Sequence, residues 1–254
     1  MAIIVTSSDG DDIWVYDVET GAGTRVTFTG LGLDPLWSPD GERLFFTMDG
    51  NIYSSQRDGE NPTLLVEEPE GSKLPISVSP DGRVLLFEAG GNEGGGDIWA
   101  YRVGEAPEPI VQTPANERGP MFSPDGDWFA YTSNESGRHE VYVRPFPGPG
   151  PKTVISTDGG WEPTWSPDGR ELFYRSGVRM MTVPVQTKPT FDAGKPMLVF
   201  EGDFNSSEGG HAHYNVAADG QRFLMVSTDT STSELHLVLN WFEELKRLVP
   251  TERR

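Results

Sequence analysis

The chain contains no cysteine among its 254 residues. Disulfide bonds, thiolate metal sites and cysteine nucleophiles are therefore excluded, and the redox compartment stays open. Basic residues are also scarce, because 20 Lys and Arg stand against 39 Asp and Glu, for a formal net charge of −19. Since phosphate backbones and anionic lipid surfaces attract clustered Lys and Arg, we expect neither nucleic acid nor an anionic membrane surface as a partner.

Long hydrophobic runs are missing as well. No stretch approaches the roughly 18 apolar residues of a membrane-spanning helix, so we expect no membrane insertion. The first residues, Met1–Thr6, lack the basic segment and the apolar run of a signal peptide. These features leave the compartment open, cytoplasmic or periplasmic, and they say nothing about the oligomeric state.

Glycine, proline and aromatic residues are abundant. The 30 Gly and 21 Pro make up about a fifth of the chain, against an average usage of roughly 12%. Both residues interrupt helices, so the composition disfavours long helices. The 7 Trp, 7 Tyr and 13 Phe supply apolar surface for a folded core, which a disordered chain would lack.

One tetrapeptide recurs along the chain. Ser-Pro-Asp-Gly occurs four times, and a decayed copy, Ala-Ala-Asp-Gly, follows. The copies begin at Ser38, Ser79, Ser123, Ser166 and Ala217, with spacings of 41, 44, 43 and 51 residues. A period of this length is typical of propeller blades.

The tetrapeptide predicts a tight turn between two strands. Proline presets φ at the second turn position, aspartate suits the third, and glycine accepts the left-handed conformation that follows. A short apolar segment precedes each copy and an apolar or aromatic run follows it, as in Leu172-Phe173-Tyr174. Two further strand-like segments come next, so each repeat contains four short strands.

We therefore predict a single all-β domain over residues 1–254, a six-bladed β-propeller of four-stranded blades with incomplete first and last blades. The predicted repeats lie near 1–30, 31–70, 71–114, 115–157, 158–201 and 202–240. The first repeat lacks the innermost strand and the last lacks the outermost. The strand Ala2–Thr6 either shifts inward or pairs with the last blade; a piece of a longer repeat array is the competing explanation. Residues 241–249 have helical periodicity and predict a short C-terminal helix.

The repeat resembles that of the TolB-like β-propellers. The segments Pro35–Gly41 and Pro163–Gly169 match the pattern Pro-x-Trp-Ser-Pro-Asp-Gly, and Asp12–Asp17 and Asp97–Trp99 match the strand Asp-Ile-Trp-Val. The resemblance covers nearly the whole chain and implies a propeller fold. The last third is similar to the C-terminal end of bacterial multidomain proteins in which a propeller follows a Ser/Thr kinase or a DNA-binding domain.

The resemblance implies a sensory or interaction module. The sequence has no Gly-rich loop, His-Arg-Asp or Asp-Phe-Gly, so it carries no kinase motif. Related propellers also cap serine peptidases, yet the chain has no Gly-x-Ser-x-Gly elbow.

The repeat also nominates a binding site. Residues just before each innermost strand converge on one mouth of the central channel of a propeller. Four residues before each turn stand Asp34, Pro75, Gly119, Glu162 and His213, and one or two residues further back stand Lys73, Arg118, Trp161, His211 and Ala212. The polar members and Trp161 are the predicted ligand-binding residues: Asp34, Lys73, Arg118, Trp161, Glu162, His211 and His213.

Two histidines, His211 and His213, give the most specific signal at this mouth. In an extended segment they share one face and could reach one ion or one substrate. With Asp34 or Glu162 they are candidates for a divalent metal site. The alternative is a pair of loop histidines that are hydrogen-bonded to backbone or water.

Two functions fit these residues. The first is binding of a small molecule, a peptide or a protein at the channel mouth, in a sensory or scaffold role. The second is an esterase-like hydrolase, with His211, His213, Glu162, Asp34 and Ser206 as candidate catalytic residues. A triad is defined by geometry and not by sequence order, and propellers host both functions, so the sequence does not choose between them.

Overall fold

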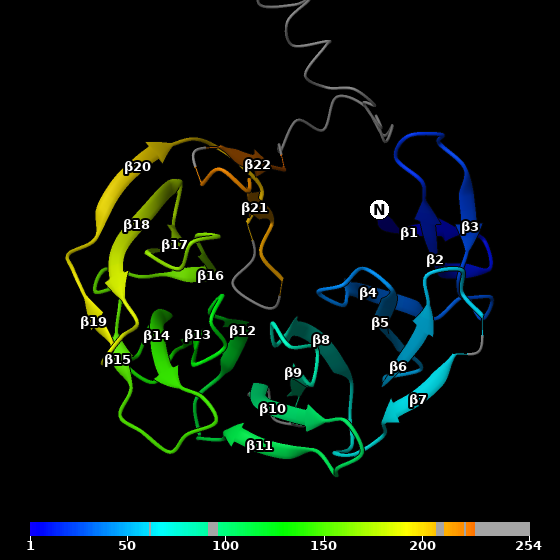
Figure 1. Ribbon diagram of the computed structural model, residues 1–254, viewed down its shortest axis with the longest axis horizontal. Coiled ribbons are helices and arrows are strands. Elements are labelled where there is room, and N and C mark those ends of the chain that lie inside the picture. The colour runs from blue at the N-terminus through cyan, green and yellow to red at the C-terminus, as the bar shows by residue number, and fades with distance from the viewer. Residues whose placement is uncertain (61, 91–95, 207–210, 221, 227–254) are drawn as a thin grey trace, which may run out of the picture.

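A computed structural model describes residues 1–60, 62–90, 96–206, 211–220 and 222–226. All the regular elements in these ranges are β-strands, and they form antiparallel sheets arranged around a common axis (Figure 1). Within the same ranges there is no helix long and apolar enough to cross a membrane. The all-β prediction is confirmed, and the sheets have the arrangement of propeller blades.

Three sheets have the predicted four-strand pattern, in which each strand pairs with the next, and the fifth sheet has five strands. The second sheet holds β4 (Gly32–Trp37), β5 (Arg43–Met48), β6 (Asn51–Gln56) and β7 (Thr63–Val66); the third holds β8 (Lys73–Val78), β9 (Val84–Gly90), β10 (Gly96–Arg102) and β11 (Glu108–Val111). The fourth holds β12 (Glu117–Phe122), β13 (Trp128–Ser133), β14 (Glu140–Pro145) and β15 (Thr153–Val154). The fifth holds β16 (Trp161–Trp165), β17 (Glu171–Ser176), β18 (Arg179–Gln186), β19 (Asp192–Ala193) and β20 (Met197–Glu201), and the last two both pair with β18.

The first and last sheets are smaller in the described part of the chain. The first holds β1 (Ala2–Ser7), β2 (Gly10–Tyr16) and β3 (Gly23–Arg25), and the last holds β21 (Tyr214–Val216) and β22 (Phe223–Met225). Strand β1 pairs with β2 and lies against β4, the innermost strand of the second sheet. Residues 227–240 of the predicted last repeat and the predicted helix at 241–249 lie outside the described residues.

The Ser-Pro-Asp-Gly turns form as predicted. The Ser166 hydroxyl donates a hydrogen bond to Asp168 Oδ1 (2.7 Å) and accepts one from the Glu171 amide (2.9 Å). The Gly169 amide closes the turn on the Ser166 carbonyl at 2.9 Å, and Gly169 has a φ of 69°. The same serine, aspartate and glycine contacts recur in the turns that begin at Ser38, Ser79 and Ser123.

The core lies between neighbouring sheets. One apolar cluster, for example, joins Leu86 and Ile98 of the third sheet to Phe122 and Tyr131 of the fourth. Corresponding clusters join the second sheet to the third and the fourth to the fifth. These neighbouring sheets are therefore held together by the burial of apolar side chains between them.

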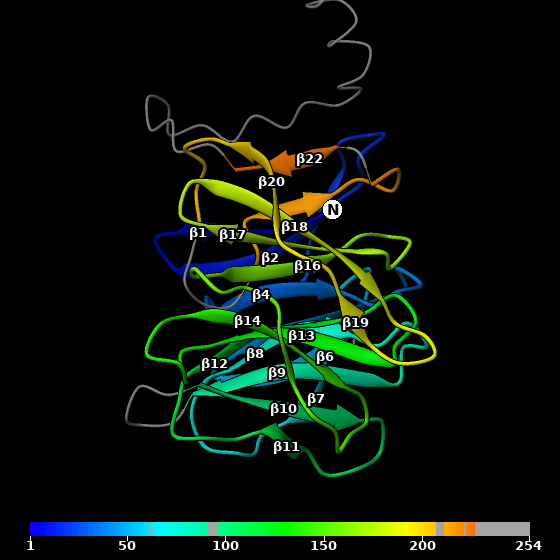
Figure 2. The same cartoon turned by 90° about the vertical axis from the view of Figure 1, so that its left-hand side faces the viewer.

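The strands run roughly along the axis of the ring, so the connections gather at its two ends (Figure 2). We call the end that carries the Ser-Pro-Asp-Gly turns the corner face. The opposite end, which we call the mouth face, carries the turns between the second and third strands and the links between sheets. The candidate site residues lie on this mouth face.

Candidate functional site

A recurring irregularity places the candidate residues. In each of β4, β8, β12 and β16 the pairing with the following strand shifts register near the position four residues before the turn. At this β-bulge Asp34, Gly119 and Glu162 adopt left-handed φ values of 52°, 60° and 56°. The left-handed region is uncommon for aspartate and glutamate and often marks a functional site. Pro75 takes the same position in β8, where its ring excludes a positive φ.

Glu162 and His213 form the better-defined polar pair. The His213 Nδ1 lies 2.8 Å from Glu162 Oε1, which also accepts a hydrogen bond from the His213 amide at 3.3 Å. The Glu162 side chain is 1% exposed and that of His213 is 34% exposed. Because a carboxylate can only accept a hydrogen bond, the proton of a neutral His213 ring lies on Nδ1. The other nitrogen, Nε2, is then left with a lone pair.

Asp34 and His211 form a second pair. The His211 Nε2 lies 3.3 Å from Asp34 Oδ1, and both side chains are partly exposed. Asp34 belongs to the second sheet, whereas His211 directly precedes β21 of the last sheet. The contact therefore joins two sheets that are not neighbours in the ring.

Glu88 and Arg118 extend this polar group towards the third and fourth sheets. Glu88 is 4% exposed, and its Oε1 accepts a hydrogen bond from the Gly119 amide at 2.6 Å. Burial raises the pKa of the Glu88 carboxyl, although the Gly119 amide and the charges of Arg118 and His211 act in the opposite direction. Counting the last sheet, which the two histidines precede, five sheets thus contribute charged or ionisable groups to one region.

Lys73 has its ammonium group engaged in hydrogen bonds within the protein. The residue is 1% exposed, and its ammonium group donates hydrogen bonds to Gly50 O (3.2 Å), Asn51 Oδ1 (3.1 Å) and Gly71 O (2.7 Å). All three donors are therefore used to join the turn between β5 and β6 to the link before β8. Burial lowers the pKa of Lys73, and the charges of Glu68 and Glu67 oppose that effect.

The other chemical candidates are not assembled in the described part of the chain. No group of three His, Asp or Glu side chains there could hold a metal ion. Ser206 is exposed, and among the described residues neither His211 nor His213 is hydrogen-bonded to a serine hydroxyl. The histidines are thus paired with carboxylates from other sheets.

Trp161 separates two hollows on the mouth face. One, of about 530 Å³, lies on the side of Ser176, Gly177 and Arg179. The other, of about 430 Å³, lies on the side of Arg138 and His139. The indole N–H of Trp161 is buried and has no hydrogen-bond partner.

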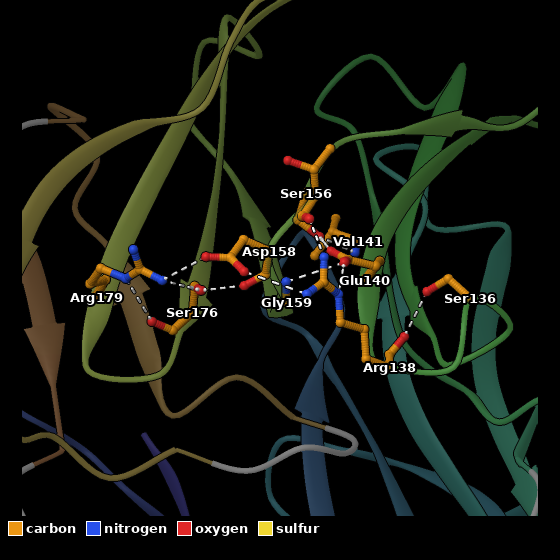
Figure 3. Close-up of polar contacts among 10 residues, drawn as sticks. Ser136, Arg138, Glu140, Val141, Ser156, Asp158, Gly159, Ser176 and Arg179 are labelled. Atoms are coloured by element: carbon orange, nitrogen blue, oxygen red, sulfur yellow. Dashed lines mark hydrogen bonds and ion pairs between the residues drawn. The ribbon is translucent and has the colours of Figure 1, made fainter.

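A polar network holds the link that leads into Trp161 (Figure 3). Asp158 lies between two arginines, with Oδ1 3.4 Å from Arg138 Nη1 and Oδ2 3.5 Å from Arg179 Nη2. Behind it, Glu140 accepts hydrogen bonds from the Gly159 amide at 3.2 Å and from the Ser156 hydroxyl. These contacts fix the position of the link between the fourth and fifth sheets.

Sequence reasoning missed two buried charged residues, Glu88 and Arg175. They occupy equivalent places in β9 and β17, and Arg175 is 1% exposed. Each directly follows an apolar or aromatic run, Leu85-Leu86-Phe87 and Leu172-Phe173-Tyr174. A charge in the same strand as such a run is the signal that could have found them, because burying a charge does not stabilise an apolar strand.

Comparison with known proteins was made by sequence and by structure. No family model matches the chain. An uncharacterized peptidase, YuxL of Bacillus subtilis, is 27% identical over 52% of this chain and 27% of its own length. An uncharacterized protein of Agrobacterium fabrum, Atu1656, is 31% identical over 54% of this chain and 52% of its own length. The Tol-Pal system protein TolB of Anaeromyxobacter dehalogenans is 29% identical over 45% of this chain and 26% of its own length. The chain therefore spans between about a quarter and a half of these relatives.

Solved structures of the same architecture are similar over most of the chain. TolB from Acinetobacter baumannii has a TM-score of 0.64 at 17% identity, over 89% of this chain and 63% of that one. An oligogalacturonate lyase in complex with manganese has a TM-score of 0.65 at 13% identity, over 90% of this chain and 68% of that one. The class defined by the fold is the β-propeller. The repeat and the fold of the chain are similar to those of the TolB propellers.

Proposed function

We propose that the chain is a ligand-binding propeller of sensory or scaffold type, which holds a small molecule or a segment of a peptide or protein at the mouth face. The proposal includes six blades, with residues 202–240 as the sixth. It rests on one observation, that the pairs Glu162–His213 and Asp34–His211 bring ionisable groups from three sheets to one place. Convergent polar groups in a concave region are typical of ligand sites.

The backbone at Asp34 and Glu162 supports this proposal. Both residues hold left-handed φ values that cost about 1–2 kcal/mol for a residue with a side chain. Glycine at these positions would avoid that strain, as Gly119 does at the equivalent place in β12. Carboxylates kept at a strained position are better explained by a binding role than by stability.

A thermal-shift screen tests the proposal. The wild-type chain is heated with amino acids, dipeptides, monosaccharides and nucleosides, each in excess. Because a ligand at about 100 times its Kd stabilises the folded state by about 2.7 kcal/mol, a true ligand should raise Tm by about 5–10 °C. His213→Ala and Asp34→Ala should abolish this rise, whereas Glu42→Gln, which removes an exposed carboxylate on the corner face, should retain it. A ligand that stabilises all four proteins equally would contradict the proposed site.

The alternative is an esterase-like hydrolase, and one contact favours it. The carboxylate of Glu162 orients His213 through Nδ1, so Nε2 is positioned as a general base, the arrangement on which hydrolytic dyads and triads depend. The name of the Bacillus relative, an uncharacterized peptidase, fits the same class. Chromogenic esters tested on wild type, His211→Ala and His213→Ala decide this alternative. Turnover that is absent, or unchanged in both variants, would remove it.

A further inference from the structure

The fifth sheet contains three buried N–H donors without an acceptor. Arg175 is 1% exposed, and its Nη2 donates to Gly177 O at 3.2 Å, whereas its Nε and Nη1 have no hydrogen-bond partner. The indole Nε1 of Trp161 is the third such donor. Within the described chain, Arg175 forms no ion pair with a carboxylate. A charged group that is buried without a partner lowers the free energy of unfolding, so a role outside stability would explain these donors.

The donors lie together on one side of the sheet. Trp161 of β16 and Arg175 of β17 are directly opposed in the strand register, and opposed residues of an antiparallel pair place their side chains on the same face. The repeat shows where this face points. Glu88, the equivalent of Arg175, reaches the Gly119 amide in the innermost strand of the next sheet. Arg175 correspondingly faces the last sheet, close enough to Tyr214 for its charge to act on that hydroxyl.

A hollow lies next to the donors. Trp161 forms part of the wall of the 530 Å³ hollow, together with Ser176 and Gly177. Gly177 is the residue whose carbonyl accepts the hydrogen bond from Arg175, so the guanidinium group lies within hydrogen-bond distance of a residue that lines the hollow. A ligand that binds in the hollow could therefore approach Trp161 and the guanidinium group together.

The charge balance selects the ligand class. Three N–H donors that include one guanidinium favour an anion, since charge-assisted hydrogen bonds are about twice as strong as neutral ones. The acidic groups nearby, Glu162, Asp158 and Glu201, oppose an anion that carries two or more charges. We propose that Arg175 and Trp161 form a subsite for a carboxylate with a single negative charge, carried by the ligand of the mouth face. The inference rests on the proposed function, because it assigns a chemical group to the ligand of that same site.

Proton–nitrogen correlation spectra of the 15N-labelled chain test the subsite. Sodium acetate and acetamide, a neutral molecule of nearly the same shape, are added separately at pH 7 with sodium chloride balancing the ionic strength. The Trp161 indole signal is identified by its loss in Trp161→Phe. Acetate should move this signal and the Arg175 Nε–H signal in a saturable manner, with an affinity at least about tenfold above that of acetamide.

The other tryptophans supply internal controls. The indole N–H groups of Trp128 and Trp165 already donate to Thr187 O and Met121 O, so their signals should stay in place and report an intact fold. Trp99 has a buried indole N–H without a partner but is a residue of the third sheet, so it distinguishes a specific site from any unsatisfied indole. Arg175→Met should abolish the acetate response, and Arg175→Lys should weaken it.

Several results would overturn the inference. These are equal responses to acetate and acetamide, an equal response of Trp99, or an acetate response that survives Arg175→Met. Should Arg175→Met fail to fold, the acetate and acetamide comparison on the wild-type chain decides alone. A neutral ligand whose binding depends on His213, found together with no acetate response, would refute the subsite and leave the proposed function standing. An acetate response without any ligand whose binding depends on His213 would leave the carboxylate subsite standing and would refute the proposed function.

Discussion

The corner face and the mouth face use the same repeat in different ways. On the corner face the four Ser-Pro-Asp-Gly turns make the same hydrogen bonds with the same residues. On the mouth face the β-bulge recurs in four sheets, but its equivalent positions hold Asp34, Pro75, Gly119 and Glu162. The backbone pattern is thus kept at both ends, whereas side-chain chemistry is repeated only at the corners. The difference teaches that the corners maintain the ring, and the varied side chains at the mouth are what the proposed binding function would require.

The largest expected effect comes from breaking a corner. The Ser166 hydroxyl is buried and satisfies the Glu171 amide and Asp168 together, so Ser166→Ala leaves these partners without it. We expect a loss of about 2 kcal/mol in the free energy of unfolding, or about 4–8 °C in Tm. Urea unfolding checks this, with the exposed Ser8→Ala as control. A Tm within 1 °C or so of wild type would show that the repeated contacts do not hold the corner.

The next largest effect is a gain in stability, expected from a substitution of Glu88, and it depends on pH. The raised pKa of Glu88 means that folding disfavours its charged form. Wild type therefore loses stability relative to Glu88→Gln as pH rises from the ordinary carboxyl pKa to the raised pKa of the folded protein. At lower pH Glu88 is protonated in both the folded and the unfolded state, so the difference in stability between the two proteins vanishes. The glutamine oxygen can still accept the Gly119 hydrogen bond.

We expect Glu88→Gln to be more stable than wild type by about 1–2 kcal/mol at pH 7 and equal to it near pH 3.5, as measured by urea unfolding at both pH values. Glu42→Gln, which removes an exposed carboxylate, controls for the change in net charge. Glu88→Gln being less stable than wild type at pH 7 would mean that the charged form has a partner that stabilises it.

A smaller effect separates stability from binding at the mouth. Asp34→Gly relieves a left-handed φ of 52° and removes only a 3.3 Å contact between partly exposed groups. We expect stability to stay level or to rise by about 0.5–1 kcal/mol, while the thermal shift caused by a ligand of the mouth falls. Asp49→Gly is the matched control, because Asp49 has the same φ in a turn. Equal ligand responses of the two variants would place Asp34 outside the site.

The smallest expected effect on stability comes from Asp168, the aspartate of a Ser-Pro-Asp-Gly turn on the corner face. The Ser166 hydroxyl and the Arg170 amide hold the pKa of Asp168 below its ordinary value. Its contribution to stability is therefore present above the ordinary carboxyl pKa and is lost as pH falls through the lowered one. Asp168→Asn should lower Tm slightly at pH 7 and by less at about pH 3, the reverse of the trend at Glu88. Thermal unfolding at the two pH values checks the sign, and a variant more stable than wild type at pH 7 would contradict it.

The sequence predicted the corners well because the information is local. Ser166, Asp168 and Gly169 lie within one turn, so spacing and turn chemistry determine their contacts. The ring of positions at the mouth also followed from the repeat, and the structure brings Glu162 to His213 and Asp34 to His211. Which carboxylate meets which histidine could not be predicted, because these contacts join sheets that are distant in the chain. Lys73 illustrates the limit: its position matches the ring, yet its ammonium group turns to three oxygens of the second and third sheets.

The orientation of His213 tests the central claim most directly. If buried Glu162 positions this ring at the mouth, the neutral imidazole carries its proton on Nδ1 and presents Nε2 as a free lone pair. Long-range proton–nitrogen spectra at pH 8 distinguish the two tautomers. The Nδ1–H form should dominate in wild type, and Glu162→Ala should shift His213 towards the Nε2–H form. A wild-type ring that is mainly Nε2–H would contradict the account, because His213 would then not be held by Glu162.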